Sequence, residues 1–325
     1  MAVFKDLFVD EEPLTMTLTT DFKDFKRKRR QEEYQSAEMT VHVDDSFEVS
    51  RPVRIKARGI YRRDNCTNPP IWLNIRHSDI EVDSIDEVVR MKLVIRCRDS
   101  KLYDDYVLRE YLVYKLYNMI TPVSYRVRLI RMNIVDTGRK NDLSQSWAFI
   151  MEPDTLMEMR LQAKMIRNDR LSMNVVNREM MDKMALFSYM VGNGDYSITG
   201  RHNVRILALR DGGEMPGFLV IPYDFDYTGL VNANYAVPGE QGQELGIEHV
   251  RERYYLGPCR SREVMERAVE ELAANRDRII QYIEDFEYLD DGEKEDMIGY
   301  LDDYFEEAED EDFINRKIEP TCRQY

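Results

Sequence analysis

The sequence lacks several motifs that identify common enzyme classes. No G-x-S-x-G is present and the four histidines are scattered, which argues against a serine hydrolase. No G-x-G-x-x-G is present either, so a phosphate-covering loop would not be of the usual glycine-rich type. The four cysteines have no C-x-x-C spacing, which argues against a zinc site. Cys66 and Cys97 can pair in an exported protein or remain buried thiols, and the sequence leaves both possibilities open.

Long apolar runs are also missing. No run approaches the roughly 18 residues that a membrane span needs, so no transmembrane segment is expected. The first residues, Met1 to Asp6, lack the apolar region of a signal peptide. An exported protein whose signal peptide had been removed would begin in the same way. The compartment therefore stays open, and export to a periplasm or cell surface is one of the possibilities.

Positive charge is scarce at one end of the chain. The net charge is −15, and residues 284 to 312 hold sixteen acidic residues and one lysine, which equals the whole imbalance. Nucleic acid is therefore not an expected partner, because phosphate contacts need a basic face. The end of the chain after about Glu309 is expected to be dispensable for chemistry. The protein is expected to be monomeric. Its 325 residues are 43% hydrophobic and 33% charged, which indicates a globular chain with an ample core.

The most informative stretch of the chain runs from residue 178 to residue 229. In its first part Met180, Met184, Phe187 and Val191 recur at helical spacing. The segment Gly192-Asn193-Gly194-Asp195 then ends the predicted helix, because glycine is the preferred residue at a helix C-terminus. A carboxylate is therefore expected to lie exposed directly after the helix.

Two strand patterns follow, at Val204 to Leu209 and at Phe218 to Ile221, with a strong turn signal at Asp211-Gly212-Gly213 between them. Asn203 stands at the entry to this predicted hairpin. The segment Pro222 to Gly229, with Asp224 and Asp226, stands at its exit. The order of these pieces predicts that Asp195, Asn203 and the later acids gather at one end of a two-stranded ribbon.

Phosphoryl transfer needs such a set of oxygen-bearing side chains. One Asp orients the acceptor hydroxyl and takes its proton, while an Asn and another Asp hold the cations that neutralise the triphosphate. Mg²⁺ prefers hard oxygen ligands and usually takes one or two protein carboxylates. ATP with Mg²⁺ or Mn²⁺ is therefore the predicted cofactor pair. A further possibility is that Asp224 and Asp226 form a calcium site or a purely structural turn.

These motifs resemble a known family. Gly192-Asn193-Gly194-Asp195, Asn203 and Pro222-Tyr223-Asp224-Phe225-Asp226 are similar to the core of the spore-coat CotH-type atypical kinases and, more distantly, of the HipA-type kinases. The resemblance covers roughly residues 50 to 255 and is closest to uncharacterised bacterial members. It implies that Asp195 is the catalytic Asp, Asn203 a metal ligand, and Asp224 or Asp226 the metal-binding Asp. One departure is the spacing of Asp and Asn, which is five in H-R-D-x-x-x-x-N and eight here.

The N-terminal half supplies further candidates. Lys92 lies in a predicted strand, and Glu110 lies on an apolar stripe of a predicted helix that starts at Asp104 or Asp105. Kinases use a strand lysine and a helix glutamate in this order to orient the α- and β-phosphates, so Lys92 is paired with Glu110. The alternative is that Glu110 is one carboxylate among several on that helix.

Three more residues are candidates for nucleotide binding. Arg58 and Arg62 lie in a segment that resembles the Arg-Gly turn of the CotH-type N-terminal lobe, and they could cover nucleotide phosphates or belong to a charged surface turn. Glu152 ends an apolar strand before Pro153. That position suits a hinge where an adenine would meet backbone groups, and it also suits any strand end.

The predicted fold class is α+β, a two-lobed protein-kinase-like fold. A smaller, mainly β lobe with one helix would span residues 1–152, and a mainly helical lobe with the catalytic loop, the hairpin and the acidic tail would span residues 153–325. The predicted function is ATP-dependent phosphotransfer. The resemblance implies a protein Ser/Thr as acceptor, and a small molecule stays open. The alternative is a catalytically inactive, kinase-like protein that binds a nucleotide or a partner.

Overall fold

The computed structural model describes residues 7–9, 11–44, 47–76, 88–167, 171–210 and 217–324. The chain forms two compact units. The first consists of Met1–Tyr111 and Arg126–Met157, and the second of Leu112–Tyr125 and Glu158–Tyr325. Helix α3 (Lys101–Ile120) contributes its first part to the first unit and its second part to the other.

Seven strands of the first unit form a closed barrel in the order β1-β2-β3-β4-β5-β7-β6. Most neighbours pair antiparallel, whereas β1 and β6 pair parallel, with Leu14 opposite Ile130. The unit also holds the short helices α1 (Phe22–Lys28) and α2 (Tyr61–Asn65) and the 3₁₀ turn Thr137–Arg139. The barrel strands are β1 (Leu14–Thr20), β2 (Gln35–Asp44), β3 (Phe47–Ala57), β4 (Ile71–Arg76), β5 (Val88–Ile95), β6 (Val127–Asp136) and β7 (Asp142–Met151).

Apolar side chains fill the interior of this barrel. Met16 and Leu18 of β1 are buried, while the residues that alternate with them are more exposed, as expected for strands with one face on a core. Val53 and Ile55 of β3 follow the same alternation. Phe22 on α1 joins the same buried cluster. The barrel is therefore filled by a packed apolar core.

The predicted fold class is wrong. A closed seven-stranded barrel of mixed parallel and antiparallel strands replaces the smaller lobe of a two-lobed kinase-like fold. The predicted strands near residues 14–19, 53–57, 71–75 and 91–95 are present. Closure depends on the parallel pairing of β1 with β6, whose residues lie more than one hundred positions apart, and local periodicity cannot indicate such a pairing. The predicted domain boundary at residue 152 stays a prediction.

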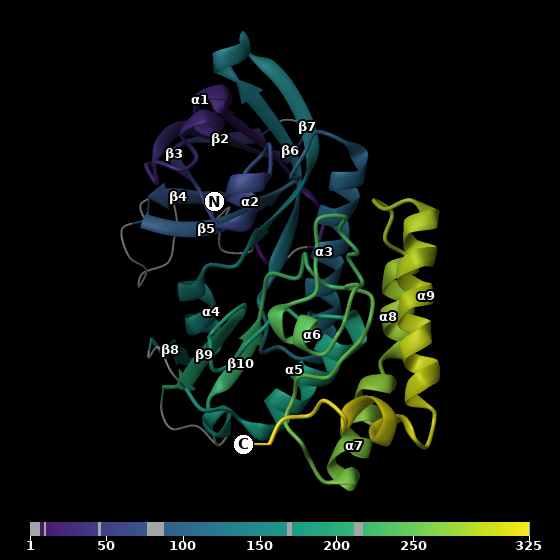
Figure 1. Ribbon diagram of the computed structural model, residues 1–325. Helices are drawn as coiled ribbons and strands as arrows, with labels where there is room; N and C mark the ends of the chain where they lie inside the picture. The colour runs from purple at the N-terminus through teal and green to yellow at the C-terminus, as the bar shows by residue number, and fades with distance from the viewer. Residues whose placement is uncertain are drawn as a thin grey trace. The chain divides into compact units, whose positions relative to one another are not determined.

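The second unit is mainly helical. Its small sheet has the order β10-β9-β8, and α8 and α9 run side by side (Figure 1). The helices after α3 are α4 (Asp154–Arg160), which starts in the first unit, α5 (Arg178–Val191), α6 (Glu240–Glu244), α7 (Arg262–Ala273), α8 (Arg276–Glu284) and α9 (Asp291–Ala308), with single turns at Met173–Val175 and Ile314–Ile318. The strands are β8 (Ala163–Met165), β9 (Val204–Leu209) and β10 (Leu219–Pro222).

The predicted hairpin is present in this sheet. β9 and β10 pair antiparallel, with Val204 opposite Pro222. The residue before β9 and the residues after β10 therefore lie at the same end of the hairpin. The turn predicted at Asp211-Gly212-Gly213 lies outside the described residues.

Each unit contains one disulfide. Cys66 pairs with Cys97 in the first unit and Cys259 with Cys322 in the second. The pairing of Cys66 with Cys97 was one of the two possibilities that the sequence left open. Within the described part of the chain, no helix combines the length and the apolar character that crossing a membrane requires.

Candidate active site

The end of α5 sets the position of Asp195. The Asn177 side chain caps the start of this helix by accepting a hydrogen bond from the backbone of Met180. Gly192 ends it in the left-handed region, with φ of 68°, a conformation that glycine adopts without a steric cost. The backbone N–H of Asp195 then donates to Asn193 Oδ1 at 3.2 Å. The predicted helix end is confirmed, and Asp195 follows it on a tightly turned segment.

A small hairpin brings Asn203 back to Asp195. Ser197 and His202 form an isolated antiparallel bridge, with two backbone hydrogen bonds of 3.0 and 2.9 Å. Asn203 Nδ2 then donates to both the backbone oxygen and Oδ2 of Asp195, each at 2.9 Å. The bridge closes off residues 198–201 as a loop. The eight-residue spacing therefore still places the amide on the carboxylate.

Asp224 and Asp226 follow β10 at the same end of the β9–β10 hairpin. The backbone N–H of Tyr223 donates to the backbone oxygen of Asn203 at 2.9 Å, which extends the hairpin pairing by one step. A carboxylate oxygen of Asp224 lies within 4.8 Å of one of Asp226. Phe225 between them is fully buried and packs edge-on against Tyr114 at 4.8 Å between ring centroids. Burial of that ring fixes the segment from which both acids project.

Hydrogen bonds hold the backbone and side chains of these two acids. The backbone N–H of Asp224 donates to the Tyr114 hydroxyl at 2.7 Å, and the Tyr235 hydroxyl donates to Asp226 Oδ2 at 3.2 Å. Asn203 and Asp224 both have positive φ, of 50° and 67°. Non-glycine residues in this region are uncommon and cluster at functional sites. These backbone conformations indicate that the chain at Asn203 and Asp224 is shaped to direct the side chains of these two residues.

His202 is a member of the site to which the sequence assigned no role. Its Nε2 lies 2.9 Å from Asp195 Oδ1, and 58% of its side chain is exposed. The hydrogen bond to Asp195 raises the pKa of His202, with the charges of Asp195 and Asp224 adding to this and partial burial opposing it. The carboxylates of Asp195 and Asp224 therefore both favour the charged form of His202.

The donor set suits a divalent cation. Asp224 and Asp226 offer hard carboxylate oxygens within 4.8 Å of each other, the kind of ligand that Mg²⁺ and Mn²⁺ prefer. Because the amide nitrogen of Asn203 is engaged by Asp195, its carbonyl oxygen is the atom that it could offer to a cation. The residues predicted as metal ligands therefore fit that role chemically.

The nucleotide-binding candidates of the N-terminal half belong to the first unit. Lys92 on β5 and Glu110 on α3 are both buried, and their predicted pairing stays a prediction. Arg62 Nη1 lies 3.7 Å from Glu110 Oε2, and Arg62 Nη2 donates to the backbone oxygen of Ile95 at 2.7 Å. The structure thus joins Glu110 to an arginine that the sequence had placed in a different role.

Arg58 and Glu152 are also buried in the first unit. The Arg58 guanidinium lies 6.0 Å from the ring of Trp72. Glu152 closes the end of the β6–β7 pair, because its N–H donates to the Arg126 oxygen at 2.9 Å and its Oε2 accepts from the Arg126 N–H at 3.2 Å. The contacts of Glu152 match the plain strand end that the sequence left open, and its adenine-binding role stays a prediction.

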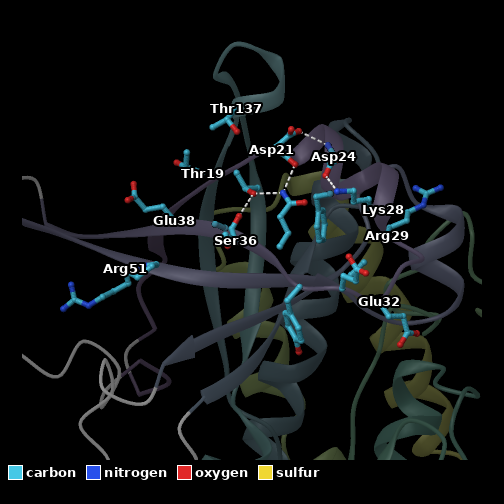
Figure 2. A pocket seen from close by; sticks show the side chains of 18 of the residues that line it. Thr19, Asp21, Asp24, Lys28, Arg29, Glu32, Ser36, Glu38, Arg51 and Thr137 are labelled. Carbon is cyan, nitrogen blue, oxygen red and sulfur yellow. Dashed lines mark hydrogen bonds and ion pairs between the residues drawn. The ribbon is translucent and has the colours of Figure 1, made fainter.

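A cavity of about 750 Å³ lies in the first unit beside α1. Charged residues of its lining pair with other side chains: Lys28 Nζ lies 2.7 Å from Asp24 Oδ2 (Figure 2), and Glu32 pairs with Arg63 at 3.2 Å. None of the predicted site residues is among the described residues that line it. The residues that line this cavity therefore have no part in the predicted chemistry.

Comparisons with known proteins find little similarity. No protein-family model matches the chain, and no curated protein matches its sequence. Among solved structures the chain is similar to the Helicobacter pylori proinflammatory kinase CtkA, with a TM-score of 0.36 and 10% identity over 72% of this chain and 86% of that one. A similarity of this size carries no argument about the site. The resemblance to the CotH and HipA types therefore rests on the quoted motifs alone.

Proposed function

We propose that this protein is a phosphotransferase that moves the γ-phosphoryl group of ATP to a hydroxyl acceptor. The single observation that carries the proposal is the end of the β9–β10 hairpin. There the Asp195–Asn203 hydrogen-bonded pair precedes β9, and the neighbouring carboxylates of Asp224 and Asp226 follow β10 at the same end of the strand pair. One base and one acidic cation site, held separately by the backbone, are what phosphoryl transfer requires.

Asp195 would act as the base. The acceptor oxygen forms a bond to the γ-phosphorus, the bond from that phosphorus to the bridging oxygen breaks, and ADP leaves with that electron pair. The proton of the acceptor hydroxyl passes to Asp195. Asn203 at Oδ2 and His202 at Oδ1 fix the plane of the carboxylate, and each oxygen keeps a further lone pair for the acceptor.

Asp224, Asp226 and the carbonyl oxygen of Asn203 would hold the divalent cation. When bound, Mg²⁺ or Mn²⁺ neutralises the phosphate charge and positions the triphosphate. Tyr235 would orient Asp226 by donating to Oδ2, which leaves Oδ1 for the cation. The CotH resemblance implies a protein Ser or Thr as the acceptor. The alternative is a small-molecule hydroxyl, and a screen of both acceptor classes would distinguish between them.

A second candidate is a nucleotide-binding protein without turnover. The observation in its favour is that His202 already engages Asp195 Oδ1, the group that would receive the proton. In that case the cation site would bind a nucleotide and Asp195 would serve only the local structure. The two candidates differ in what Asp195 does, and a substitution there separates them.

The test compares binding and transfer in the same variants. Wild-type protein with ATP and Mg²⁺ or Mn²⁺ should gain about 2.7 kcal/mol of stability at a ligand concentration one hundred times the Kd. Asp195→Asn should keep that thermal shift and lose transfer of labelled phosphate. The double change Asp224→Asn with Asp226→Asn should lose the shift itself.

Asp303→Asn, on the exposed face of α9, is the matched control and should change neither readout. The absence of any thermal shift with millimolar nucleotide and metal would refute nucleotide binding. Full transfer activity in Asp195→Asn would remove the proposed base, and binding without transfer in the wild type would select the second candidate.

A further inference from the structure

Tyr254 lies between α6 and α7, far in sequence from the candidate catalytic loop. Its side chain is only 8% exposed, and its hydroxyl oxygen is fully buried. The segment that carries it was not singled out by any motif.

The Tyr254 hydroxyl occupies the space that a side chain at Gly194 would need. A Cβ at Gly194 would overlap the Tyr254 hydroxyl oxygen, and a Cβ at Gly242 would collide with the same group. Gly239 lies close to the same loop, because a Cβ there would overlap the Gly194 carbonyl oxygen and come within 3.5 Å of the Asp195 Cα. Gly194 and Gly242 thus allow the phenol ring to pack directly against the backbone before Asp195, and Gly239 allows its own segment to approach the same backbone.

The chemistry of this phenol excludes a role as a base. Burial, with the negative charge of Asp195 adding to it, raises the pKa of Tyr254 to about 12, while the backbone groups of Gly239 and Gly242 act in the opposite direction. The hydroxyl therefore stays protonated throughout the physiological range. Tyr254 therefore lies beside Asp195 as a neutral group.

The residues on both sides of Tyr254 are anchored. Arg253 Nε donates to the backbone oxygen of Met190 at 3.1 Å, near the end of α5. The backbone N–H of Tyr255 donates to Thr321 Oγ1 at 3.1 Å. The neighbouring disulfide Cys259–Cys322 fixes the same part of the chain end. Hydrogen bonds of the residues on both sides therefore hold Tyr254 in place next to the loop that contains Gly194 and Asp195.

We propose that Tyr254 is a positioning residue that sets the backbone path of Gly194 and Asp195, and through it the direction of the Asp195 carboxylate. The proposal rests on the proposed function, since it assigns Tyr254 a part in phosphoryl transfer. This role of Tyr254 does not involve Asp224 or Asp226, because the contacts that define it are to Gly194, directly before Asp195, and to Gly242 in α6. It should therefore affect the rate of transfer and leave binding of nucleotide and cation intact.

The first experiment measures kcat and the Kd for ATP with Mg²⁺ in Tyr254→Leu and Tyr254→Phe. Tyr254→Leu should lower kcat by at least about tenfold, because a misplacement of about 1 Å can cost about 100-fold, and the Kd should stay within about twofold. Tyr254→Phe keeps the ring and should retain most of the rate. A parallel loss of binding and rate, or an unchanged kcat in Tyr254→Leu, would overturn the proposal.

The second experiment tests the fit between the ring and the glycine. Gly194→Ala should abolish most of the transfer in the wild-type background, where the new methyl group meets the Tyr254 hydroxyl. In the Tyr254→Ala background the space is vacant, so the same change should add little further loss. Gly299→Ala is the control, because nothing lies within 4 Å of a Cβ at Gly299. Additive effects of Gly194→Ala and Tyr254→Ala would contradict direct contact between the two sites.

The third measurement does not depend on activity. Amide hydrogen exchange in residues 192–196 should speed up in Tyr254→Leu by at least about tenfold, while exchange in α9 stays unchanged. If the wild type neither binds nucleotide nor transfers phosphate, the proposed function fails, and the exchange data alone then decide whether Tyr254 holds the loop. Unchanged exchange in residues 192–196 would refute the positioning role whatever the activity.

Discussion

At the scale of single residues, His202 links the charge of the site to the stability of the fold. Its Nε2 contacts Asp195 Oδ1 at 2.9 Å, and this hydrogen bond raises its pKa above the usual value. The charged form of His202 is therefore favoured in the folded state. The folded protein gains stability from this below the unfolded-state pKa of about 6.5, and the gain is lost as the pH rises through the raised pKa.

A pH series of thermal unfolding tests this contact in metal-free protein. His202→Gln keeps a nitrogen donor but cannot become charged. The wild type should exceed His202→Gln in melting temperature by more at about pH 5.5 than at about pH 8.5. Because more than half of the His202 side chain is exposed, solvent screening will keep the difference small. An equal difference at both pH values would show that His202 does not gain its proton through Asp195.

At the scale of secondary structure, the end of α5 is fixed by a glycine and a distant tyrosine. Gly192 has φ of 68°, and a Cβ there would overlap the hydroxyl oxygen of Tyr300 on α9 and lie 3.0 Å from the backbone nitrogen of Gly229. The hydrogen bonds from Gly229 to Gly192 and from Leu230 to Val191, both 3.0 Å, tie the same turn to the segment after Asp226. These hydrogen bonds therefore join the end of α5 directly to the segment that follows Asp226.

Substitution of Gly192 should be much more costly than substitution of a glycine with the same backbone conformation in open space. Gly246 has φ of 78° and nothing within 4 Å of its Cβ position. Gly246→Ala should therefore cost only the left-handed conformation, about 1 kcal/mol. Gly192→Ala carries that cost and the overlap with Tyr300, so it should exceed about 2 kcal/mol in urea unfolding. Equal losses would show that the contact with Tyr300 adds nothing.

At the scale of the whole molecule, each unit is closed by its own disulfide. The two bridges join residues 31 and 63 positions apart. The bridge between Cys259 and Cys322 is reinforced by the backbone, because Cys259 N–H donates to the Arg323 oxygen and Arg323 N–H donates to the Gly257 oxygen, both at 2.9 Å. The chain end after Glu309, which the sequence predicts to be dispensable for chemistry, is therefore part of the second unit.

Loss of the second bridge should destabilise the second unit. By chain entropy, a loop of this length is worth about 4 kcal/mol, so the double change of Cys259 and Cys322 to Ser should lower the unfolding transition of that unit. Truncation after Glu309 should act in the same direction. The matched control is the double change of Cys66 and Cys97 to Ser, which should affect the first unit instead. Domain-resolved hydrogen exchange distinguishes the two, and an identical pattern for both variants would contradict the assignment.

The sequence by itself determined the local elements of this protein. The apolar stripe of α5, its glycine end and the two strands of the hairpin all follow from the periodicity and turn chemistry of consecutive residues. The order of Asp195, Asn203 and Asp224 along these elements also predicted that they lie at one end of the hairpin, because in an antiparallel pair the start of the first strand lies beside the end of the second. Local sequence patterns were sufficient to predict a contact wherever a short segment of chain joins the two elements that make it.

Only the tertiary structure decided the features that join distant parts of the chain. The parallel pairing of β1 with β6 closes the barrel, and neither strand shows in its own residues which partner it takes. The bridge between Ser197 and His202 absorbs the extra residues before Asn203, and Tyr254 reaches Gly194 from a segment without a motif. The sequence does not show which glycines leave room for a neighbouring side chain, as Gly194 does and Gly299 does not. Which side chain fills that room depends on contacts between residues far apart in the chain, and these exist only in the folded molecule.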